Sequence, residues 1–252
     1  MLAWALWLAA SLIRWLRWAW TQFSTGGCFH QTPKNPATPP PLQQTRRTVP
    51  ASTIDAGAIT LHVLTHMSLL FLKRALANPL RVGYVVPSSP FLTRQTAKRI
   101  DFSKPRVVVE LGPGEGCHTR QIVKRMNADS RLILLELDKE FANHLQKYFA
   151  HDARVTVLHS DALHLPETLE KLGHTHCDYI ISGLPFLVID EPVRNAILKN
   201  IARVMREDSR FITYQVSDQL CGHKHLFELA SREYCRLNLP PINVFEFKKA
   251  AA

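Results

Sequence analysis

The sequence predicts an α/β fold in which a mostly parallel sheet of seven strands carries helices on both faces. The first observation is the apolar β-branched run at 107–109, which is typical of a buried parallel strand. Glu110 and a glycine-rich turn end this run, and a helix-compatible segment at 117–126 follows. The second observation is that strand-like and helix-like segments alternate from there onward, which favours a parallel sheet covered by helices.

The remaining elements follow from hydrophobic periodicity and from turn residues. Further strands are expected at 131–136, 155–159, 178–182, 209–216, 234–238 and 243–248. Helices are expected at 54–77, 91–100, 117–126, 139–149 and 191–205. Ser89 can cap the 91–100 helix, with Pro90 in its first turn. Ligands of such sheets bind where the carboxyl ends of parallel strands meet.

The segment 1–23 is apolar and rich in tryptophan, and it predicts a membrane-associating helix. Its unbroken apolar run, 2–13, is shorter than the roughly 20 residues that a spanning helix needs. Alternating Trp and Arg residues then suit a helix that lies in the membrane interface or barely inserts. A cleaved signal peptide is the alternative, but positive charge follows the apolar run instead of preceding it. If the helix inserts, this charge order keeps the body of the protein on the cytoplasmic side.

Three further regions complete the predicted organisation. Residues 24–53 hold six prolines among polar residues, so they predict a linker. Residues 54–100 contain the amphipathic 54–77 helix and helices expected to cover the cofactor. Residues 101–252 form the predicted catalytic core.

The charge of the chain indicates an anionic partner. The 252 residues carry a net charge of +10, and no acidic residue precedes Asp55. Because apolar helices adjoin the basic clusters, we expect an anionic membrane surface as the partner and regard nucleic acid as the weaker interpretation. The five cysteines are scattered without a C-x-x-C pair, which is typical of reduced thiols, and no metal site is expected.

The glycine-rich turn is the predicted cofactor site. The pattern Glu110-x-Gly112-Pro113-Gly114-x-Gly116 is the one that S-adenosylmethionine (SAM) methyltransferases use, although an ordinary strand-turn-helix corner is the alternative. Pro113 removes a backbone N–H, which argues against a dinucleotide-phosphate cradle.

The ends of the following strands supply the rest of this site. Glu136 is placed to accept hydrogen bonds from a ribose diol, with Leu137 beside it and Asp138 as the alternative acid. The adenine amino group is expected at Asp161 and Ala162. Further cofactor contacts are expected at Ser182 and Gly183, after the fourth strand of the core.

The segment Gly183-Leu184-Pro185-Phe186 is where a methyl acceptor is expected. Methylation of a base nitrogen usually uses an amide or an acid at the first of these positions, because hydrogen bonds must shape the nitrogen lone pair. An alkyl amine needs only to lose its proton. Gly183 therefore favours an alkyl amine over nucleic acid.

Six segments together resemble the bacterial phospholipid N-methyltransferases, which are distantly similar to the rRNA adenine dimethyltransferases. They are Asn-Pro-Leu-Arg-Val-Gly at 78–83, Val-Pro-Ser-Ser at 86–89, Glu-Leu-Gly-Pro-Gly at 110–114, Ser-Gly-Leu-Pro at 182–185, Thr-Tyr at 213–214 and Asn-Leu-Pro-Pro at 238–241. The resemblance covers about 61–248, whereas residues 1–53 are not part of the family pattern. It implies a Rossmann-like class I methyltransferase fold with SAM as the cofactor.

The resemblance also implies an activity, the stepwise methylation of phosphatidylethanolamine toward phosphatidylcholine. Tyr214 and Tyr84 are then candidates to hydrogen-bond the amine or relay its proton, and Phe186 to hold the growing ammonium by a cation–π contact. The acceptor is expected to contact Leu184, Pro185, Arg81, Lys73 and Arg74. Three alternatives stay open, namely an ornithine-type amino-lipid, an rRNA adenine, and a non-catalytic SAM-binding protein. The sequence leaves the oligomeric state and the number of methyl groups undecided.

Overall fold

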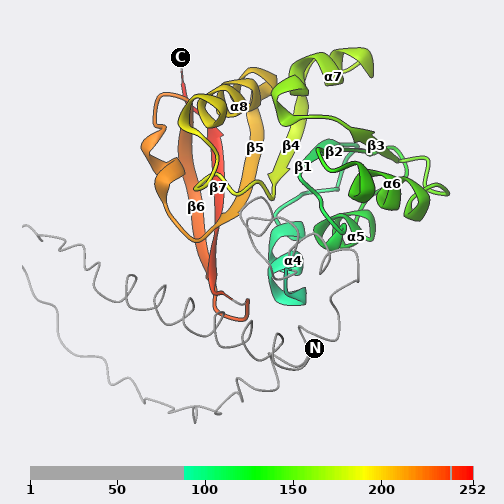
Figure 1. Ribbon diagram of the computed structural model, residues 1–252, viewed down its shortest axis with the longest axis horizontal. Helices are drawn as coiled ribbons and strands as arrows, with labels where there is room; N and C mark the ends of the chain where they lie inside the picture. The colour runs from blue at the N-terminus through cyan, green and yellow to red at the C-terminus, as the bar shows by residue number, and fades with distance from the viewer. Residues whose placement is uncertain (1–87, 239, 252) are drawn as a thin grey trace, which may run out of the picture. The chain divides into compact units, whose positions relative to one another are not determined.

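The computed structural model describes residues 88–238 and 240–251, which form a three-layered α/β unit (Figure 1). Its seven-stranded sheet has the order β3-β2-β1-β4-β5-β7-β6. The strands are β1 (Val107–Leu111), β2 (Arg131–Glu136), β3 (Val155–His159), β4 (Cys177–Ser182), β5 (Met205–Gln215), β6 (Phe227–Cys235) and β7 (Ile242–Lys249). Strands β1 to β5 pair in parallel, and β7 runs antiparallel between β5 and β6. The predicted mostly parallel, seven-stranded sheet is therefore confirmed.

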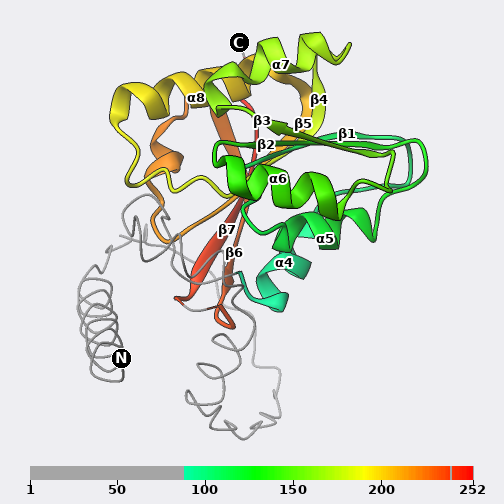
Figure 2. The ribbon, with the colours of Figure 1, turned by 45° about the vertical axis from the view of Figure 1, so that its right-hand side comes forward.

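Helices cover both faces of this sheet, as Figure 2 shows from a second side. The helices are α4 (Pro90–Ala97), α5 (Cys117–Val123), α6 (Lys139–Tyr148), α7 (Leu165–Lys171) and α8 (Glu191–Val204), with short 3-10 turns η1 (Ala162–His164) and η2 (Gln219–Gly222). Apolar residues of α4, α5 and α6 share one buried cluster with the sheet, and those of α7, α8 and η2 share the other. The core thus has two halves separated by the sheet.

Most of the predicted elements within 88–251 are confirmed to within a few residues, and three differ. β5 begins at Met205, directly after α8, and not at 209. β6 occupies Phe227–Cys235 and not 234–238, because this edge strand is exposed along most of its length and lacks the alternating apolar pattern. Helix α7 was not predicted, since its seven residues are too few to show a clear period.

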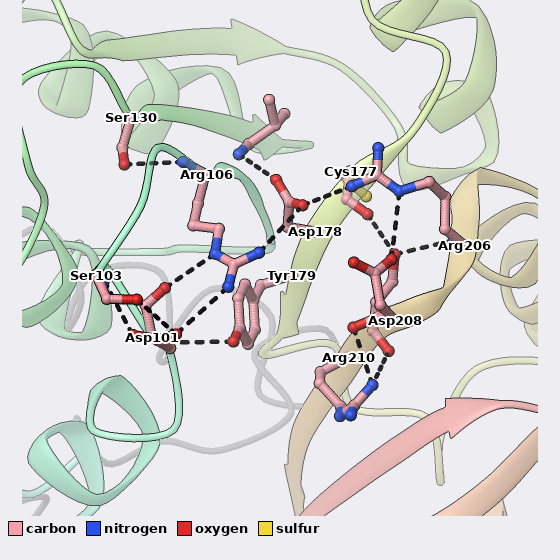
Figure 3. Close-up of polar contacts among 12 residues, drawn as sticks. Asp101, Ser103, Arg106, Ser130, Cys177, Asp178, Tyr179, Arg206, Asp208 and Arg210 are labelled. Atoms are coloured by element: carbon pink, nitrogen blue, oxygen red, sulfur yellow. Dashed lines mark hydrogen bonds and ion pairs between the residues drawn. The ribbon is translucent and has the colours of Figure 1, made fainter.

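The amino-terminal edge of the sheet is held by an ionic cluster (Figure 3). The Asp178 carboxylate accepts a hydrogen bond from the Val107 amide at 2.7 Å and pairs with Arg206 at 2.6 Å and Arg106 at 3.6 Å. The Arg106 guanidinium also lies over the Tyr179 ring, 5.6 Å from its centroid. These contacts join the starts of β1, β4 and β5, and so fix how the opposite, carboxyl ends of the same strands align.

Helix α4 begins as predicted. Ser89 is its N-cap, because the Ser89 hydroxyl accepts a hydrogen bond from the Leu92 amide at 3.2 Å, and Pro90 is its first residue. Within residues 88–251, no helix combines the length and the apolar character that crossing a bilayer requires. The predicted 1–23 helix, the 24–53 linker and the 54–77 helix lie outside the described residues.

Candidate active site

The glycine-rich turn continues the hydrogen bonding of β1 beyond the end of the strand. The Gly112 amide donates to the Leu135 carbonyl of β2 at 2.9 Å, and the Gly183 amide donates to the Leu111 carbonyl at 2.9 Å. Gly112, Gly114 and Gly116 have φ values of 67°, 55° and 75°, a left-handed region that glycine adopts without strain. Among the described residues, a Cβ atom on Gly114 would meet no atom within 4 Å, so this part of the structure leaves open space on that side of the turn.

Glu136 lies at the end of β2 and reaches this turn. Its carboxylate accepts hydrogen bonds from the amides of Gly114 and Asp138, both at 2.9 Å. Burial raises the pKa of Glu136, and these backbone N–H groups oppose the shift. Asp138 instead caps α6 by accepting from the Glu140 amide at 2.8 Å. Of the two acids considered for the ribose, Glu136 is therefore the one that faces the glycine turn.

The end of β3 lies next to the end of β2. The Ser160 amide donates to the Glu136 carbonyl at 3.0 Å, which brings Asp161 to the same edge. The Asp161 carboxylate caps η1 by accepting from the Leu163 amide at 2.9 Å, and Ala162 is buried beneath it. Leu137 follows Glu136 with 66% of its surface exposed, so its apolar side chain is available to pack against the adenine ring of the cofactor. The edge that holds Gly112 thus also holds both predicted acids.

A second carboxyl group lies under the turn. Glu110 is 1% exposed, and its carboxylate accepts a hydrogen bond from the Thr119 hydroxyl at 2.7 Å. Burial raises the pKa of Glu110 to about 7, with the negative charge of Glu136 as a smaller cause. A positive group bound beside the turn would favour the ionised form of this carboxyl.

Gly183, at the end of β4, is covered by the Tyr214 side chain of β5. A Cβ atom on Gly183 would overlap the Tyr214 hydroxyl, and it would come within 2.9 Å of the Gly112 carbonyl oxygen. The Tyr214 hydroxyl also hydrogen-bonds the Ser88 side chain. Burial raises the pKa of Tyr214 above its ordinary value, so the phenol stays neutral. The Tyr214 phenol therefore occupies the space that a side chain at position 183 would need, and only glycine fits there without displacing it.

His118 of α5 is a site residue that the sequence analysis missed. Its ring stacks on Tyr214 with centroids 4.3 Å apart and planes 6° apart. His118 is 3% exposed, and neither of its ring nitrogens has a hydrogen-bond partner among the residues that the structure describes. Burial lowers its pKa to about 3, so the imidazole is neutral. The only sequence signal for His118 is its place two residues after Gly116, at the start of the expected helix.

Two of the segments that carry the family resemblance meet beside Tyr214. The Ser89 amide donates to the Asn238 side-chain oxygen at 2.9 Å, and the Asn238 amide group donates to the Pro240 carbonyl at 2.9 Å. These bonds hold the start of α4 against the β6–β7 connection, next to the Ser88 contact with the phenol.

The structure describes some of the residues predicted to contact the acceptor. Ser182 ends β4, and Leu184 and Pro185 follow it at the edge that holds the site. Leu184 packs near Gly112, and the Ser182 hydroxyl accepts a hydrogen bond from the Leu184 amide at 3.2 Å. The structure differs from the prediction for Phe186, because its ring is 1% exposed and packs edge-on to Phe211 in the core. Tyr84, Arg81, Lys73 and Arg74 lie outside the described residues.

The strand order, the glycine turn and an acid at the end of β2 together define a class I SAM-dependent methyltransferase. The residues present fit this cofactor, because space is open beside Gly114 and the side chains of Glu136 and Leu137 lie next to that space. When bound, SAM supplies an activated methyl group. All the residues predicted to contact the cofactor line this one edge or lie directly behind it: Glu110, Gly112, Pro113, Gly114, Gly116, Glu136, Leu137, Asp161, Ala162, Ser182 and Gly183.

The chain belongs to the ribosomal RNA adenine dimethylase family, whose model matches residues 87–223. It is similar to an ornithine lipid N-methyltransferase of Singulisphaera acidiphila, with 30% identity over 178 residues that cover 70% of this chain and 93% of the relative. It is also similar to ribosomal RNA small subunit methyltransferase A of Mycoplasma capricolum, with 23% identity over 128 residues, 50% of this chain and 46% of the relative. The chain thus spans about half the length of that rRNA relative.

Among solved structures, TrmN from Thermus thermophilus resembles the chain with a TM-score of 0.55 and 16% identity, covering 69% of this chain and 53% of TrmN. This likeness supports the fold. The chain is accordingly a SAM-dependent methyltransferase, with SAM as its cofactor. The sequence prediction of the fold and the cofactor is confirmed.

Proposed function

We propose that this protein transfers methyl groups from SAM to the amine of a membrane lipid. The observation that carries the proposal is the pair formed by Gly183 and Tyr214. The position after β4 offers neither an amide nor an acid, and a neutral phenol fills the space of the missing side chain. The site therefore presents one hydroxyl where a base-methylating site would present groups that shape an aromatic amine.

An alkyl amine suits this arrangement. Its pKa is roughly 10, so at neutral pH it is mostly an ammonium that must lose a proton before it becomes a nucleophile. The neutral Tyr214 oxygen can accept a hydrogen bond from an N–H group of the amine and so orient its lone pair. The released proton passes to solvent or to an acid of the site. Alignment by Tyr214 is then the main contribution of the chain on the acceptor side.

Two acceptor lipids have specific support, and both carry a primary alkyl amine. Phosphatidylethanolamine is favoured by the set of segments that resembles the phospholipid N-methyltransferases, with phosphatidylcholine as the product. An ornithine lipid is favoured by the relative that shares 30% identity along 93% of its own length. In either case we expect the protein to work at the cytoplasmic side of an anionic membrane surface, attached through residues 1–23 or 54–77.

An rRNA adenine is the second candidate function, because the family and several relatives carry that description. The glycine at 183 counts against it.

The test is label transfer from methyl-labelled SAM in three parallel reactions. The acceptors are vesicles with phosphatidylethanolamine, vesicles with an ornithine lipid, and ribosomal RNA. Label in either lipid supports the proposal, and the ratio between the two lipids assigns the acceptor. Label confined to RNA, or none in any acceptor from a protein that binds SAM, would overturn it. A Gly114→Val variant serves as the cofactor-free control, because its side chain would fill the open space beside the turn.

A further inference from the structure

Exposed apolar side chains gather at the carboxyl edge of the sheet. The residues that are described include ten large apolar side chains with substantial exposure, and five of them lie at this edge: Phe91, Leu137, Leu187, Val188 and Leu237. Leu137 adjoins Glu136 and is accounted for by the cofactor. The other four lie around the acceptor side of the site. Single exposed apolar residues are normal anywhere on a protein surface, whereas a group of them at one place indicates an interaction surface.

The positions of these four residues follow from the sheet. Ser88 and Ser89 contact Tyr214 and Asn238, so Phe91, the second residue of α4, lies at the site edge. β6 is antiparallel to β7, which is antiparallel to β5, so β6 ends at the same edge, and Leu237 follows two residues later. Helix α4 and the β6–β7 connection reach the same end of the described unit in Figures 1 and 2.

The third contribution comes from the loop between β4 and α8. Leu187 and Val188 are 51% and 56% exposed, three and four residues after Leu184, whose side chain packs near Gly112. Asp190 and Glu191 follow after Ile189 and are exposed, so this loop adds apolar surface next to negative charge. We call the set Phe91, Leu187, Val188 and Leu237 the apolar rim.

Positive charge accompanies the rim on the α4 and β6–β7 side. Arg94 and Lys98 are exposed three and seven residues after Phe91, which places all three on one face of α4 and its C-terminal end. Arg236 is exposed next to Leu237. In the part of the chain that the structure describes, no carboxylate pairs with these three cations, whereas the neighbouring Arg99 is bound by Glu233 and Glu246.

We infer that the apolar rim, with Arg94, Lys98 and Arg236, docks the catalytic core on the surface of an anionic bilayer. The inference rests on the proposed function, because a lipid amine stays at the membrane and must reach the site from there. Apolar side chains flanked by Lys and Arg match the boundary between acyl chains and anionic headgroups. The core then meets the membrane with the edge that holds Gly183 and Tyr214, independently of any contact made by residues 1–87.

Hydrogen exchange on the full chain tests this surface directly. Vesicles of phosphatidylcholine and phosphatidylglycerol, without any amine-bearing lipid, keep the measurement independent of catalysis. We expect slower amide exchange in the peptides that cover 90–98, 184–190 and 234–238. The amide exchange of the two segments around Leu172 and around Leu229, which are also exposed, should not change. Unchanged exchange in all three rim segments, with protection elsewhere, would overturn the inference.

Matched variants separate the rim from general hydrophobicity. Leu187→Ser with Leu237→Ser should weaken vesicle association by about tenfold, because two partly buried leucines are lost. Leu172→Ser with Leu229→Ser removes the same chemistry at 37% and 43% exposed sites away from the rim and should have no such effect. Equal loss in both pairs would contradict the inference.

Substitution of the basic residues gives a second, independent test of the docking surface. Arg94→Gln and Arg236→Gln should each weaken association with the anionic vesicles by about fivefold and leave association with neutral vesicles unchanged. If the wild-type protein labels no lipid but these binding differences appear, the proposed function fails and the docking surface stands. If the protein methylates a lipid and the rim variants bind and react normally, the docking surface fails alone.

Discussion

Replacing Gly183 by alanine perturbs the acceptor side of the site at one atom. The new Cβ would lie 2.9 Å from the Gly112 carbonyl oxygen and 3.3 Å from the Tyr214 ring carbon that bears the hydroxyl. The backbone oxygen belongs to a turn tied to β2, so the phenol must move. Overpacking of this kind costs about 1–3 kcal/mol in the free energy of unfolding. A displaced phenol also loses its bond to Ser88, which is worth about 1 kcal/mol.

Activity should fall further than stability. A catalytic group moved by about 1 Å can cost on the order of 100-fold in rate, so we expect kcat/KM toward the lipid amine to drop by about that factor while SAM affinity changes little. Urea unfolding, calorimetric SAM binding and label transfer measure the three effects. Gly222→Ala is the matched control, because a Cβ there meets no atom of the described residues within 4 Å, and it should change stability by less than about 0.5 kcal/mol.

A double variant tests the cause. Removing the hydroxyl with Tyr214→Phe relieves the closest overlap, so Gly183→Ala should destabilise the Tyr214→Phe protein by about 1–2 kcal/mol less than it destabilises the wild type. Additive effects, or a Gly183→Ala protein as stable and active as Gly222→Ala, would refute the reasoning that the phenol stands in for a side chain at position 183.

Three other predictions concern the cofactor side and the buried groups. Glu136→Gln should weaken SAM binding by about 10- to 100-fold in calorimetry, because a charged acceptor is lost, whereas Glu228→Gln at the opposite end of the sheet should bind normally. Glu110 has a folded-state pKa of about 7 against 4.5 when exposed, so the wild type should lose about 2.5 kcal/mol of unfolding free energy between pH 5 and pH 8, and Glu110→Gln should not. His118 has a folded-state pKa of about 3 against 6.5, so the wild type should lose about 2 kcal/mol between pH 7 and pH 5; a His118→Phe protein with the same loss would contradict this.

The residues assigned to the cofactor could be placed at one edge of the sheet from the sequence, because each lies at or just after the end of a strand with a strong apolar signal. Glu136 ends β2, Gly112 follows β1 directly, and Asp161 lies two residues after β3; parallel pairing alone brings such strand ends together. The acceptor half depends on how side chains from different elements meet. The sequence places Tyr214 on β5 and Gly183 after β4, but nothing in it shows that the hydroxyl covers the glycine.

Three other features differ from the prediction for physical reasons. His118 looks like an exposed helix residue, since its burial arises only when α5 packs against β5 and the ring stacks on Tyr214. Phe186 looked available to an acceptor because it follows the loop motif, yet the chain turns its ring into the core against Phe211. Edge strand β6 was misplaced because exposure on both faces removes the apolar alternation.

The most direct test of the central claim is a crystal structure with S-adenosylhomocysteine bound. We predict the ribose at Glu136, the adenine beside Leu137 and Asp161, the amino-acid end along Gly112–Gly116, and the sulfur facing the space next to Gly183 and Tyr214. A ligand bound away from the carboxyl edge of the sheet, or with its sulfur turned from the Tyr214 hydroxyl, would contradict the account.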